Sequence, residues 1–349
     1  MAAQWGVGMI GAGPGVSALH LPTLARLGES FRVVRVADGG SGRAADLAAR
    51  TGARATSDAA DVIADPAVEV VAICSPPELH AAQAIAAAHA RKRAILCEKP
   101  LGTTHDEVDR VIEACRAHGT ALVVGTNHLH DPAWGRAKHY MLEREWRVRG
   151  ISVTLALPPN GRYHEAVTEL PAMAPGGRRP APDWGNPAVV AAIVRQLILG
   201  LAIHDLPLVR DLAPDLERVA FARPAPPIGC SVGFVASGVP VSLTAVMLAG
   251  GADALWRIRI LTDGDEIDID FPPAFVHRGS AAVTVRDADG REIRYPTDPE
   301  DGYVAEWRAL AALIDGGQTT EYDEVAADAH FAIALADAAA EWIRAEAAS

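Results

Sequence analysis

The segment WGVGMIGAGPGV, residues 5–16, decides the fold of this chain. Within it the apolar run Val7–Ile10 predicts a buried strand, a glycine-rich string follows at once, and Ser17–Leu27 has the pattern of a helix. Between a strand and a helix, Gly11 permits a tight turn and Gly13 lets the backbone approach a pyrophosphate group. The first N–H groups of the helix would face that anion. This context predicts a dinucleotide-binding turn.

The rest of the turn fits the dinucleotide pattern in part. Pro14 suits the first turn of a helix, and Gly15 extends the glycine-rich string. The third glycine of the pattern would fall at position 16, where this chain has Val16. Close packing between strand and helix must therefore be reached in another way. The alternative is an ordinary strand, turn and helix with no ligand.

Apolar runs and helix-sized segments alternate along the first 125 residues. The expected strands are Val7–Ile10, Val33–Ala37, Val68–Ile73, Ala94–Cys97 and Ala121–Val124. The expected helices between them are Ser17–Leu27, Gly42–Arg50, Pro77–Ala90 and Thr104–His118. Near-continuous apolar runs are typical of parallel strands covered on both faces. The fold class predicted for residues 1–125 is therefore α/β, with the doubly wound parallel sheet of a dinucleotide-binding Rossmann domain.

After residue 125 the order of elements changes. The expected elements are a helix at Pro132–Arg144, a strand at Ile151–Leu157, a loop at Pro158–Asn186, a long helix at Pro187–Leu212, strands over residues 220–295 and helices at Tyr303–Asp315 and Glu324–Ala347. Consecutive strands without helices between them predict an open, largely antiparallel sheet. We therefore expect residues 126–349 to form an α+β domain for substrate binding and oligomerisation, with terminal helices able to pack on the first domain.

Composition excludes several classes of protein. Of 349 residues, 50% are hydrophobic and 22% charged, so the chain is long and apolar enough for two globular domains. The net charge of −12 argues against nucleic acid as a partner. The four cysteines form no CxxC pair, and no metal site is expected. The chain shows neither a signal peptide nor a membrane-spanning apolar run, which predicts a cytoplasmic protein without a membrane partner.

Asp38 ends the second expected strand, 27 residues after Gly11. A carboxylate at about this distance can accept hydrogen bonds from the ribose hydroxyls of adenosine and would repel a 2′-phosphate. Arg43 could pair with such a phosphate, but it lies within the next expected helix. The sequence thus favours NAD over NADP as cofactor. A helix cap is the alternative role for Asp38.

Two further segments complete a family resemblance. They are ICSPPELH at residues 73–80 and LCEKPL at residues 96–101. Together with Gly11–Gly13, His20–Pro22 and Asp38, they resemble the family of glucose–fructose oxidoreductase, inositol dehydrogenase and rhizopine-catabolism proteins, called Gfo/Idh/MocA. The resemblance covers nearly the whole chain, because the second domain and the terminal helices also suit that family.

Lys99 is the first candidate for a catalytic residue. It follows the carboxyl end of an expected parallel strand, where open α/β sheets bind ligands. Its ammonium group could donate to the reacting oxygen of a substrate and stabilise developing negative charge, with Glu98 orienting it. The resemblance also makes a cis Lys99–Pro100 bond an expectation. A solvent-exposed lysine after a strand is the alternative.

The loop after the third expected strand is a candidate cofactor contact. Ser75, Pro76 and His80 are expected to shape it around the nicotinamide, although His80 could equally be a structural residue at a helix start. Asn127 and His128 follow the last expected parallel strand and so lie at the same ligand-binding edge. Asn127 could bind cofactor and His128 substrate.

His204 is the second catalytic candidate. The resemblance implies a histidine on this helix with an aspartate one turn earlier, and His204 matches the histidine. The aspartate position is Gly200, and a later aspartate of the family corresponds to Pro207. The usual support for an acid–base histidine is therefore missing from this helix. A satisfied core histidine is the alternative.

The irregular segment 158–186 holds Arg162, Tyr163 and His164, which could contact substrate from a lid or substrate loop. A solvated loop is equally compatible with these residues.

The resemblance implies an NAD(H)-dependent dehydrogenase or reductase that interconverts a secondary alcohol and a ketone on a sugar, cyclitol or related polar metabolite. It also implies a homodimer or homotetramer formed through the C-terminal sheet. Two alternatives remain open. One is a redox-neutral enzyme with retained NAD, in which transient oxidation permits elimination or glycosidic cleavage. The other is an NAD-binding sensor or scaffold without catalysis, which Gly200 makes conceivable.

Overall fold

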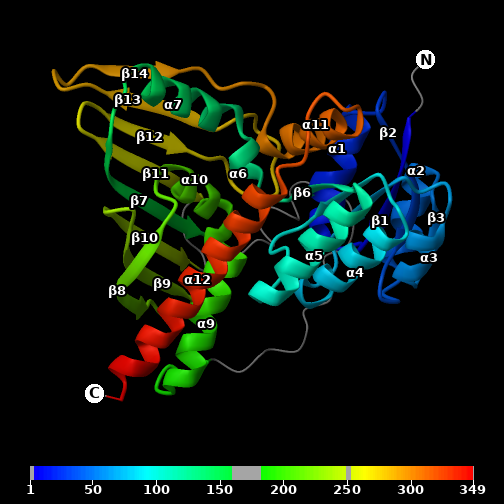
Figure 1. Ribbon diagram of the computed structural model, residues 1–349, viewed down its shortest axis with the longest axis horizontal. Helices are drawn as coiled ribbons and strands as arrows, with labels where there is room; N and C mark the ends of the chain where they lie inside the picture. Colours follow the sequence, from blue (N-terminus) through cyan, green and yellow to red (C-terminus); the bar gives the residue numbers. More distant parts are fainter. Residues whose placement is uncertain (1–3, 159–181, 249–252, 349) are drawn as a thin grey trace. The chain divides into compact units, whose positions relative to one another are not determined.

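The computed structural model of the protein describes residues 4–158, 182–248 and 253–348 (Figure 1). The chain divides into two compact units. Unit 1 contains the described residues up to Gly125 together with 303–330, and unit 2 contains the described parts of 126–302 and 331–348. Helix α12 (Tyr322–Glu346) belongs to both units, because His330 is the last residue assigned to unit 1.

Unit 1 is built on a six-stranded sheet (Figure 1). Its strands are β1 (Trp5–Ile10), β2 (Phe31–Ala37), β3 (Arg54–Thr56), β4 (Val70–Ile73), β5 (Ala94–Cys97) and β6 (Ala121–Val124). They lie in the order β3-β2-β1-β4-β5-β6, and every pair is parallel. The strands β4 and β5 are buried along their whole length, as expected where helices cover both faces. The predicted doubly wound sheet is confirmed.

Helices connect these strands in the expected order. They are a π-helical turn (Val16–His20), α1 (Leu21–Arg26), α2 (Arg43–Thr51), α3 (Ala59–Ala64), α4 (Pro77–His89) and α5 (His105–His118), with α11 (Gly302–Ile314) added from the C-terminal part of the chain. The sequence pattern missed β3 and α3. Both are short, and β3 has no buried side chain while α3 buries only Val62, so neither carries a periodic apolar signal.

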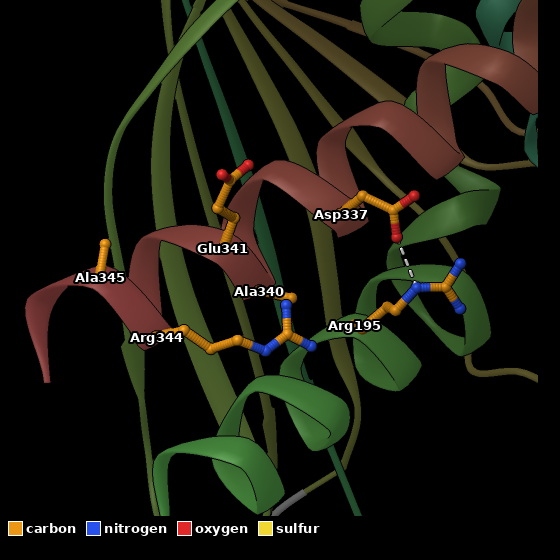
Figure 2. Close-up of a pocket in the computed structure, with 6 residues that line it drawn as sticks. All are labelled: Arg195, Asp337, Ala340, Glu341, Arg344 and Ala345. Carbon is orange, nitrogen blue, oxygen red and sulfur yellow. Dashed lines mark hydrogen bonds and ion pairs between the residues drawn. The ribbon is translucent and has the colours of Figure 1, made fainter. Parts of the chain in front are cut away.

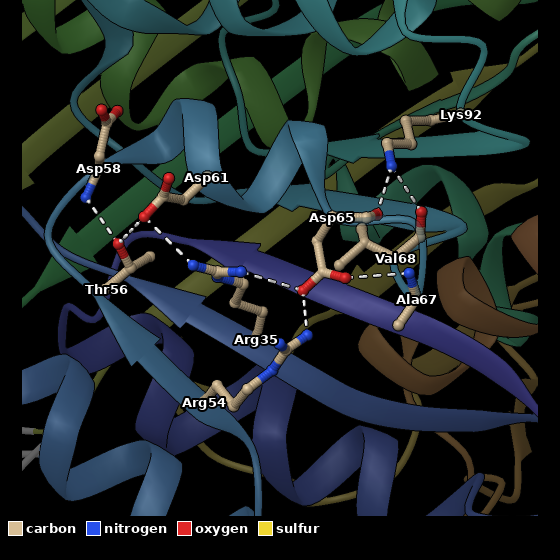
Figure 3. Close-up of polar contacts among 9 residues, drawn as sticks. All are labelled: Arg35, Arg54, Thr56, Asp58, Asp61, Asp65, Ala67, Val68 and Lys92. Atoms are coloured by element: carbon tan, nitrogen blue, oxygen red, sulfur yellow. Dashed lines mark hydrogen bonds and ion pairs between the residues drawn. The ribbon is translucent and has the colours of Figure 1, made fainter.

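The buried carboxylate of Asp65 links the edge strands β2 and β3 to the segment before β4 (Figure 3). Asp65, with 5% of its surface exposed, accepts hydrogen bonds from the Ala67 amide at 3.0 Å and the Arg35 guanidinium at 3.2 Å, and it also pairs with Arg54. Lys92 donates to the Asp65 carbonyl oxygen at 2.8 Å from the other side. The network ties β2, β3 and the segment before β4 together.

Unit 2 contains an eight-stranded mixed sheet (Figure 1). Its strands are β7 (Val148–Leu157), β8 (Leu216–Pro224), β9 (Gly229–Ala236), β10 (Val239–Met247), β11 (Leu255–Thr262), β12 (Glu266–Asp270), β13 (Ala282–Arg286) and β14 (Glu292–Tyr295). Their order is β14-β13-β12-β11-β7-β10-β9-β8, and only β7 and β10 pair in parallel. The expected open, largely antiparallel sheet is confirmed. Its second face stays partly exposed, and the cross-strand pair Arg257–Asp270 lies there.

Helices of unit 2 accompany this sheet. They are α6 (Asn127–His130), α7 (Pro132–Glu143), α9 (Pro187–Gly200), a 3-10 turn (Ala202–His204), α10 (Leu206–Leu212) and the end of α12. Among them α7 contacts β12 and β13, and α9 contacts β9. The prediction of one helix over Pro187–Leu212 is wrong. Pro207 has no N–H to continue the hydrogen bonds of α9, and Gly200 has a low helix propensity, so the chain breaks between them.

Helices α9 and α12 run side by side across an open groove (Figure 2). The Arg195 guanidinium donates to Asp337 at 2.6 Å across it, and the other lining residues are Ala340, Glu341, Arg344 and Ala345. Of the described residues, 187–204 alone form a stretch long and apolar enough to cross a membrane. Here its side chains Val190, Val194 and Ile198 are buried in unit 2, which is the environment of a core helix.

The Asp65 network predicts a pH-dependent stability. Burial alone would raise the pKa of Asp65, but the Ala67 amide and the two arginines outweigh it and hold the pKa below its usual 3.8. Asp65→Asn should lower the free energy of unfolding by about 2–3 kcal/mol at neutral pH, because Arg35 loses a charged partner. The folded-state pKa is lowered, so this contribution is present above pH 3.8 and is lost as pH falls below it. Urea unfolding of both proteins across pH measures the difference.

Asp61→Asn is the matched control for this network. Asp61 also bonds Arg35, at 3.1 Å, but its side chain is 53% exposed. Its loss should cost less than about 1 kcal/mol. Equal destabilisation by the two substitutions would contradict the role given to Asp65.

Candidate functional site

The turn after β1 requires glycine at its first position. Gly11 has φ +116°, and a Cβ there would lie 2.3 Å from the Cys74 carbonyl oxygen. The backbone of the turn thus lies directly against the end of β4. A side chain at position 11 would prevent this close approach. A Cβ at Gly13, in contrast, would meet no atom within 4 Å. Gly11 serves the close approach of two loops, and Gly13 leaves the backbone of the turn accessible.

Residues 14–16 open the following helix. Gly15 is the N-cap of the π-helical turn, and the Val16 amide donates to the Gly13 carbonyl oxygen at 3.1 Å. Val16 is 1% exposed and belongs to the core of unit 1. Its buried side chain packs between strand and helix, where a third glycine would instead let the two backbones approach closely. Pro14 precedes this turn and contributes its carbonyl oxygen to the Ser17 hydroxyl. The accessible backbone at Gly13 and the adjoining helix start fit the pyrophosphate of a dinucleotide.

Asp38 organises the loop after β2. Its carboxylate accepts from the Gly40 amide at 2.7 Å, the Ser41 hydroxyl at 2.8 Å and the Ala44 amide at 2.8 Å. Burial opposes its charge, but these donors hold the pKa of Asp38 below its ordinary value. Asp38 is therefore an ionised carboxylate that bonds the first turn of α2 through the Ala44 amide, while Gly42 is the N-cap residue. Both Asp38 and Arg43 stay partly exposed.

His80 joins the loops that follow β4 and β5. It is 1% exposed, and its two ring nitrogens lie 2.7 Å from the Pro100 carbonyl oxygen and 2.8 Å from the Ser75 carbonyl oxygen. The Ser75 hydroxyl donates to Gln83 at 2.6 Å, and Pro76 is the N-cap residue of α4. His80 therefore joins the loops that carry Ser75 and Pro100, and its contact with a cofactor stays a prediction.

Glu98 is anchored by residues that sequence reasoning did not place in the site. Its Oε1 atom lies 2.9 Å from His20 Nε2, and the Trp307 indole N–H donates to His20 Nδ1 at 3.2 Å. Because a carboxylate oxygen can only accept, Nε2 donates its proton to Glu98. Burial would raise the pKa of Glu98, but the His20 bond and nearby positive charge lower it, so the carboxylate is ionised.

Two neighbours complete the setting of Glu98. A Cβ at Gly125 would lie 3.2 Å from Glu98 Oε2, so glycine there leaves room for the carboxylate. The Lys99 backbone amide donates to Oε2 at 3.3 Å. His20 was known from the sequence only as part of the family resemblance. Trp307 and Gly125 gave no local signal, since both act through contacts distant in sequence.

Lys99 lies at the carboxyl end of β5, next to this carboxylate. The Lys99–Pro100 peptide bond is cis, as expected. The side chain is half-buried. Burial lowers the pKa of Lys99, and the Glu98 charge offsets only part of that effect. An ammonium group in this setting is less hydrated than a surface lysine and can donate strongly to an oxygen placed beside it.

Unit 2 brings His128 and His204 together around Asp205. His128 Nδ1 donates to Asp205 Oδ1 at 2.9 Å, and the Trp256 indole donates to Asp205 Oδ2 at 2.7 Å. The His204 ring lies 5.6 Å from the His128 ring, centroid to centroid. Asn127 precedes His128 at the start of α6 and is 7% exposed. Sequence reasoning missed Asp205 and Trp256, which meet His128 only in the folded chain.

Other expected residues are not part of these two clusters. Arg162, Tyr163 and His164 lie outside the described residues. Within the described part of the chain, no group of three or more His, Cys, Asp or Glu side chains is arranged to hold a metal ion. The described residues predicted for the site do not line the groove of Figure 2.

Comparison with known proteins identifies the family. Residues 5–126 match the profile of the Gfo/Idh/MocA family, described as an oxidoreductase family with an NAD-binding Rossmann fold. Inositol 2-dehydrogenase 2 of Saccharopolyspora erythraea is 39% identical over 316 residues, which cover 88% of this chain and 91% of that protein. An uncharacterized oxidoreductase of Bacillus subtilis is 34% identical, and the match spans only 40% of its length.

The fold has close structural neighbours. A 3-ketoreductase from Actinomadura kijaniata, solved with NADP and TDP-benzene, superposes with a TM-score of 0.74 at 19% identity, over 96% of this chain and 98% of that one. At this identity the match concerns the fold alone. The match to inositol 2-dehydrogenase 2, in contrast, covers 88% of this chain at 39% identity, which shows that the two proteins belong to one family. The chain belongs to the Gfo/Idh/MocA family of NAD(P)-dependent oxidoreductases and is related to the inositol 2-dehydrogenases.

Proposed function

We propose that this protein is an NAD(H)-dependent dehydrogenase or reductase that interconverts a secondary alcohol and a ketone on a sugar, cyclitol or related polar metabolite. The observation that carries the proposal is Lys99, held at the carboxyl end of β5 beside the anchored carboxylate of Glu98. Open parallel sheets bind ligands at that edge. The relationship to an inositol 2-dehydrogenase over 88% of the chain supports a polyol substrate.

The residues of the β1 turn would hold the pyrophosphate of the cofactor. Gly13 leaves the backbone open to it, Gly11 permits the tight turn, and the helix start at Gly15 supplies N–H groups. Ser75, Pro76 and Asn127 are the proposed contacts nearer the nicotinamide, with His80 fixing the Ser75 loop. When bound, NAD supplies the hydride acceptor or donor at its nicotinamide ring.

Lys99 and His204 are the proposed catalytic residues. Lys99 donates to the reacting oxygen and stabilises the negative charge that develops on it as the carbon-bound hydride leaves or arrives. His204 accepts the hydroxyl proton in oxidation and returns it in reduction. His128, Arg162, Tyr163 and His164 are proposed to contact the substrate.

Asp38 is the proposed basis of a preference for NAD over NADP. Its ionised carboxylate can accept from ribose hydroxyls and repel a 2′-phosphate. Two observations keep NADP as the second candidate: Asp38 already accepts three hydrogen bonds from its own loop, and the structural neighbour from Actinomadura kijaniata was solved with NADP.

We further propose a cytoplasmic homodimer or homotetramer that forms through the uncovered face of the unit 2 sheet. Small and polar side chains such as Ser152, Thr154 and Ser242 lie on that face with the Arg257–Asp270 pair. A second copy of the same sheet could cover them.

The direct test incubates the purified protein with NAD or NADP and a panel of inositols, sugars and the corresponding ketones. Net formation of NADH or loss of its absorbance supports the proposal. Product formation without net cofactor reduction would instead identify the redox-neutral chemistry with retained NAD. Tight NAD binding with no product from any substrate would favour a sensor or scaffold.

Lys99→Met should lower turnover about a hundredfold or more, because a single well-placed donor at a developing oxyanion contributes roughly 3–4 kcal/mol. NAD affinity should stay within a few fold, since Lys99 is proposed to meet substrate. Steady-state kinetics and cofactor titration measure the two effects. The control is Lys138→Met, which removes a lysine paired with Asp211 on the surface of unit 2 and should leave both values unchanged. Near-native turnover of Lys99→Met would show that the active site proposed here is in the wrong place.

Asp38→Ser should shift cofactor preference toward NADP, because the repulsive carboxylate is removed while a hydroxyl remains to accept one hydrogen bond. The ratio of NAD to NADP dissociation constants is the measured quantity. Asp46→Ser is the control, since Asp46 is an exposed acidic residue in the first turn of the same helix, α2. Tighter native binding of NADP than of NAD would refute the role given to Asp38.

A further inference from the structure

Asp205 is a fully buried carboxylate that follows His204 in the chain. Each of its oxygens accepts a hydrogen bond from an aromatic ring: Oδ1 from His128 Nδ1 at 2.9 Å and Oδ2 from the Trp256 indole at 2.7 Å. The donors come from α6 and β11, far from Asp205 in sequence. Because a buried charge is tolerated only with such partners, Asp205 fixes the orientation of both rings.

His204 packs against the same two rings. Its centroid lies 5.6 Å from that of His128 and 5.5 Å from that of Trp256, to which it is nearly perpendicular at 82°. His128 is held further by a parallel stack on Phe271, with centroids 3.6 Å apart. The rings that flank His204 are therefore the rings that Asp205 holds.

The break after α9 explains how this arrangement arises. His204 ends a 3-10 turn rather than continuing a regular helix from Gly200. Position 200 therefore does not lie one α-helical turn before His204, as a supporting side chain would have to. We propose that Asp205 is the positioning residue of His204. It sets the His204 ring through His128 and Trp256, and its charge stabilises the imidazolium that forms when His204 accepts the hydroxyl proton.

The other titratable groups around the cluster do not duplicate this role. His130, also on α6, has a pKa lowered to about 4 by burial and stays neutral. Asp131, at the start of α7, has a pKa raised by burial, and its carboxylate accepts from the Ala133 and Ala281 amides. Among the described groups around His204, Asp205 is the carboxylate that bonds an imidazole of the cluster.

This inference rests on the proposed function, in which His204 exchanges a proton with substrate. Asp205→Asn preserves the shape of the side chain and removes its charge. It should lower kcat about tenfold or more and leave KM within about threefold, because the group acts on proton transfer. Without the carboxylate the imidazolium is less stable. The acidic limb of the kcat/KM profile for alcohol oxidation should therefore move to lower pH.

The matched control is Asp265→Asn. Asp265 is also buried in unit 2, at 9% exposure, and accepts a hydrogen bond from an aromatic residue, the Tyr140 hydroxyl, at 2.8 Å. Its substitution removes a comparable buried interaction without touching the His204 cluster. It should lower thermal stability and leave the pH profile in place. An equal shift of the profile in both variants would overturn the proposal.

A readout independent of turnover separates the inference from the proposed function. Imidazole NMR signals of the full chain, with His204 identified by the signal lost in His204→Ala, give the pH at which its ring is protonated. In Asp205→Asn this pH should fall by about half a unit or more. An unchanged His204 titration overturns the inference even if the enzyme is active. The expected shift in a protein without dehydrogenase activity would refute only the proposed function.

His128→Asn provides a second route if Asp205→Asn does not fold. The Asn amide can donate to Asp205 near the position of Nδ1, so the buried charge keeps a partner while one flanking ring is removed. Turnover should fall about threefold or more, and KM should rise as well, because His128 is also a proposed substrate contact. Native turnover in this variant would contradict positioning through His128.

Discussion

The hydrogen bond between His20 and Glu98 is the interaction on which the ligand edge of unit 1 depends. It fixes a partly buried carboxylate at the end of β5, beside the residue proposed to meet substrate. The His20 ring donates in this bond because the carboxylate oxygen can only accept, and Trp307 contacts the other nitrogen of the ring. A helix from the C-terminal part of the chain, α11, thus helps to position His20. Glu98 in turn stays charged, and its charge offsets part of the decrease in the pKa of Lys99 that burial causes.

Close backbone approaches set the rest of that edge. Gly11 lies against the Cys74 carbonyl, which brings the loops after β1 and β4 together, and Gly125 after β6 leaves room for the Glu98 carboxylate after β5. His80 bridges two of these loops through their carbonyl oxygens. Such contacts make the edge rigid, which is the property that positioning of a hydride donor and acceptor demands.

The parallel sheet could be predicted from sequence because its strands are short apolar runs between helices of clear period, and the expected bounds of β5 and β6 agree with the structure. The break between α9 and α10 was missed because the apolar pattern continues through it. It depends on Pro207, whose effect is local and steric. Lys99 was singled out because it follows a strand within a recognisable motif. Asp205 was not, because its partner His128 is 77 residues away and no spacing rule links them.

The central claim is that a carbon-bound hydride passes between substrate and nicotinamide in a site that contains Lys99. The most direct measurement uses inositol or a sugar deuterated at each carbinol carbon, with NAD and the native protein, and follows the isotope by mass spectrometry. The account predicts deuterium at C4 of the reduced nicotinamide, in equal amount to the ketone formed. Ketone or any other product without deuterium in the cofactor would contradict it.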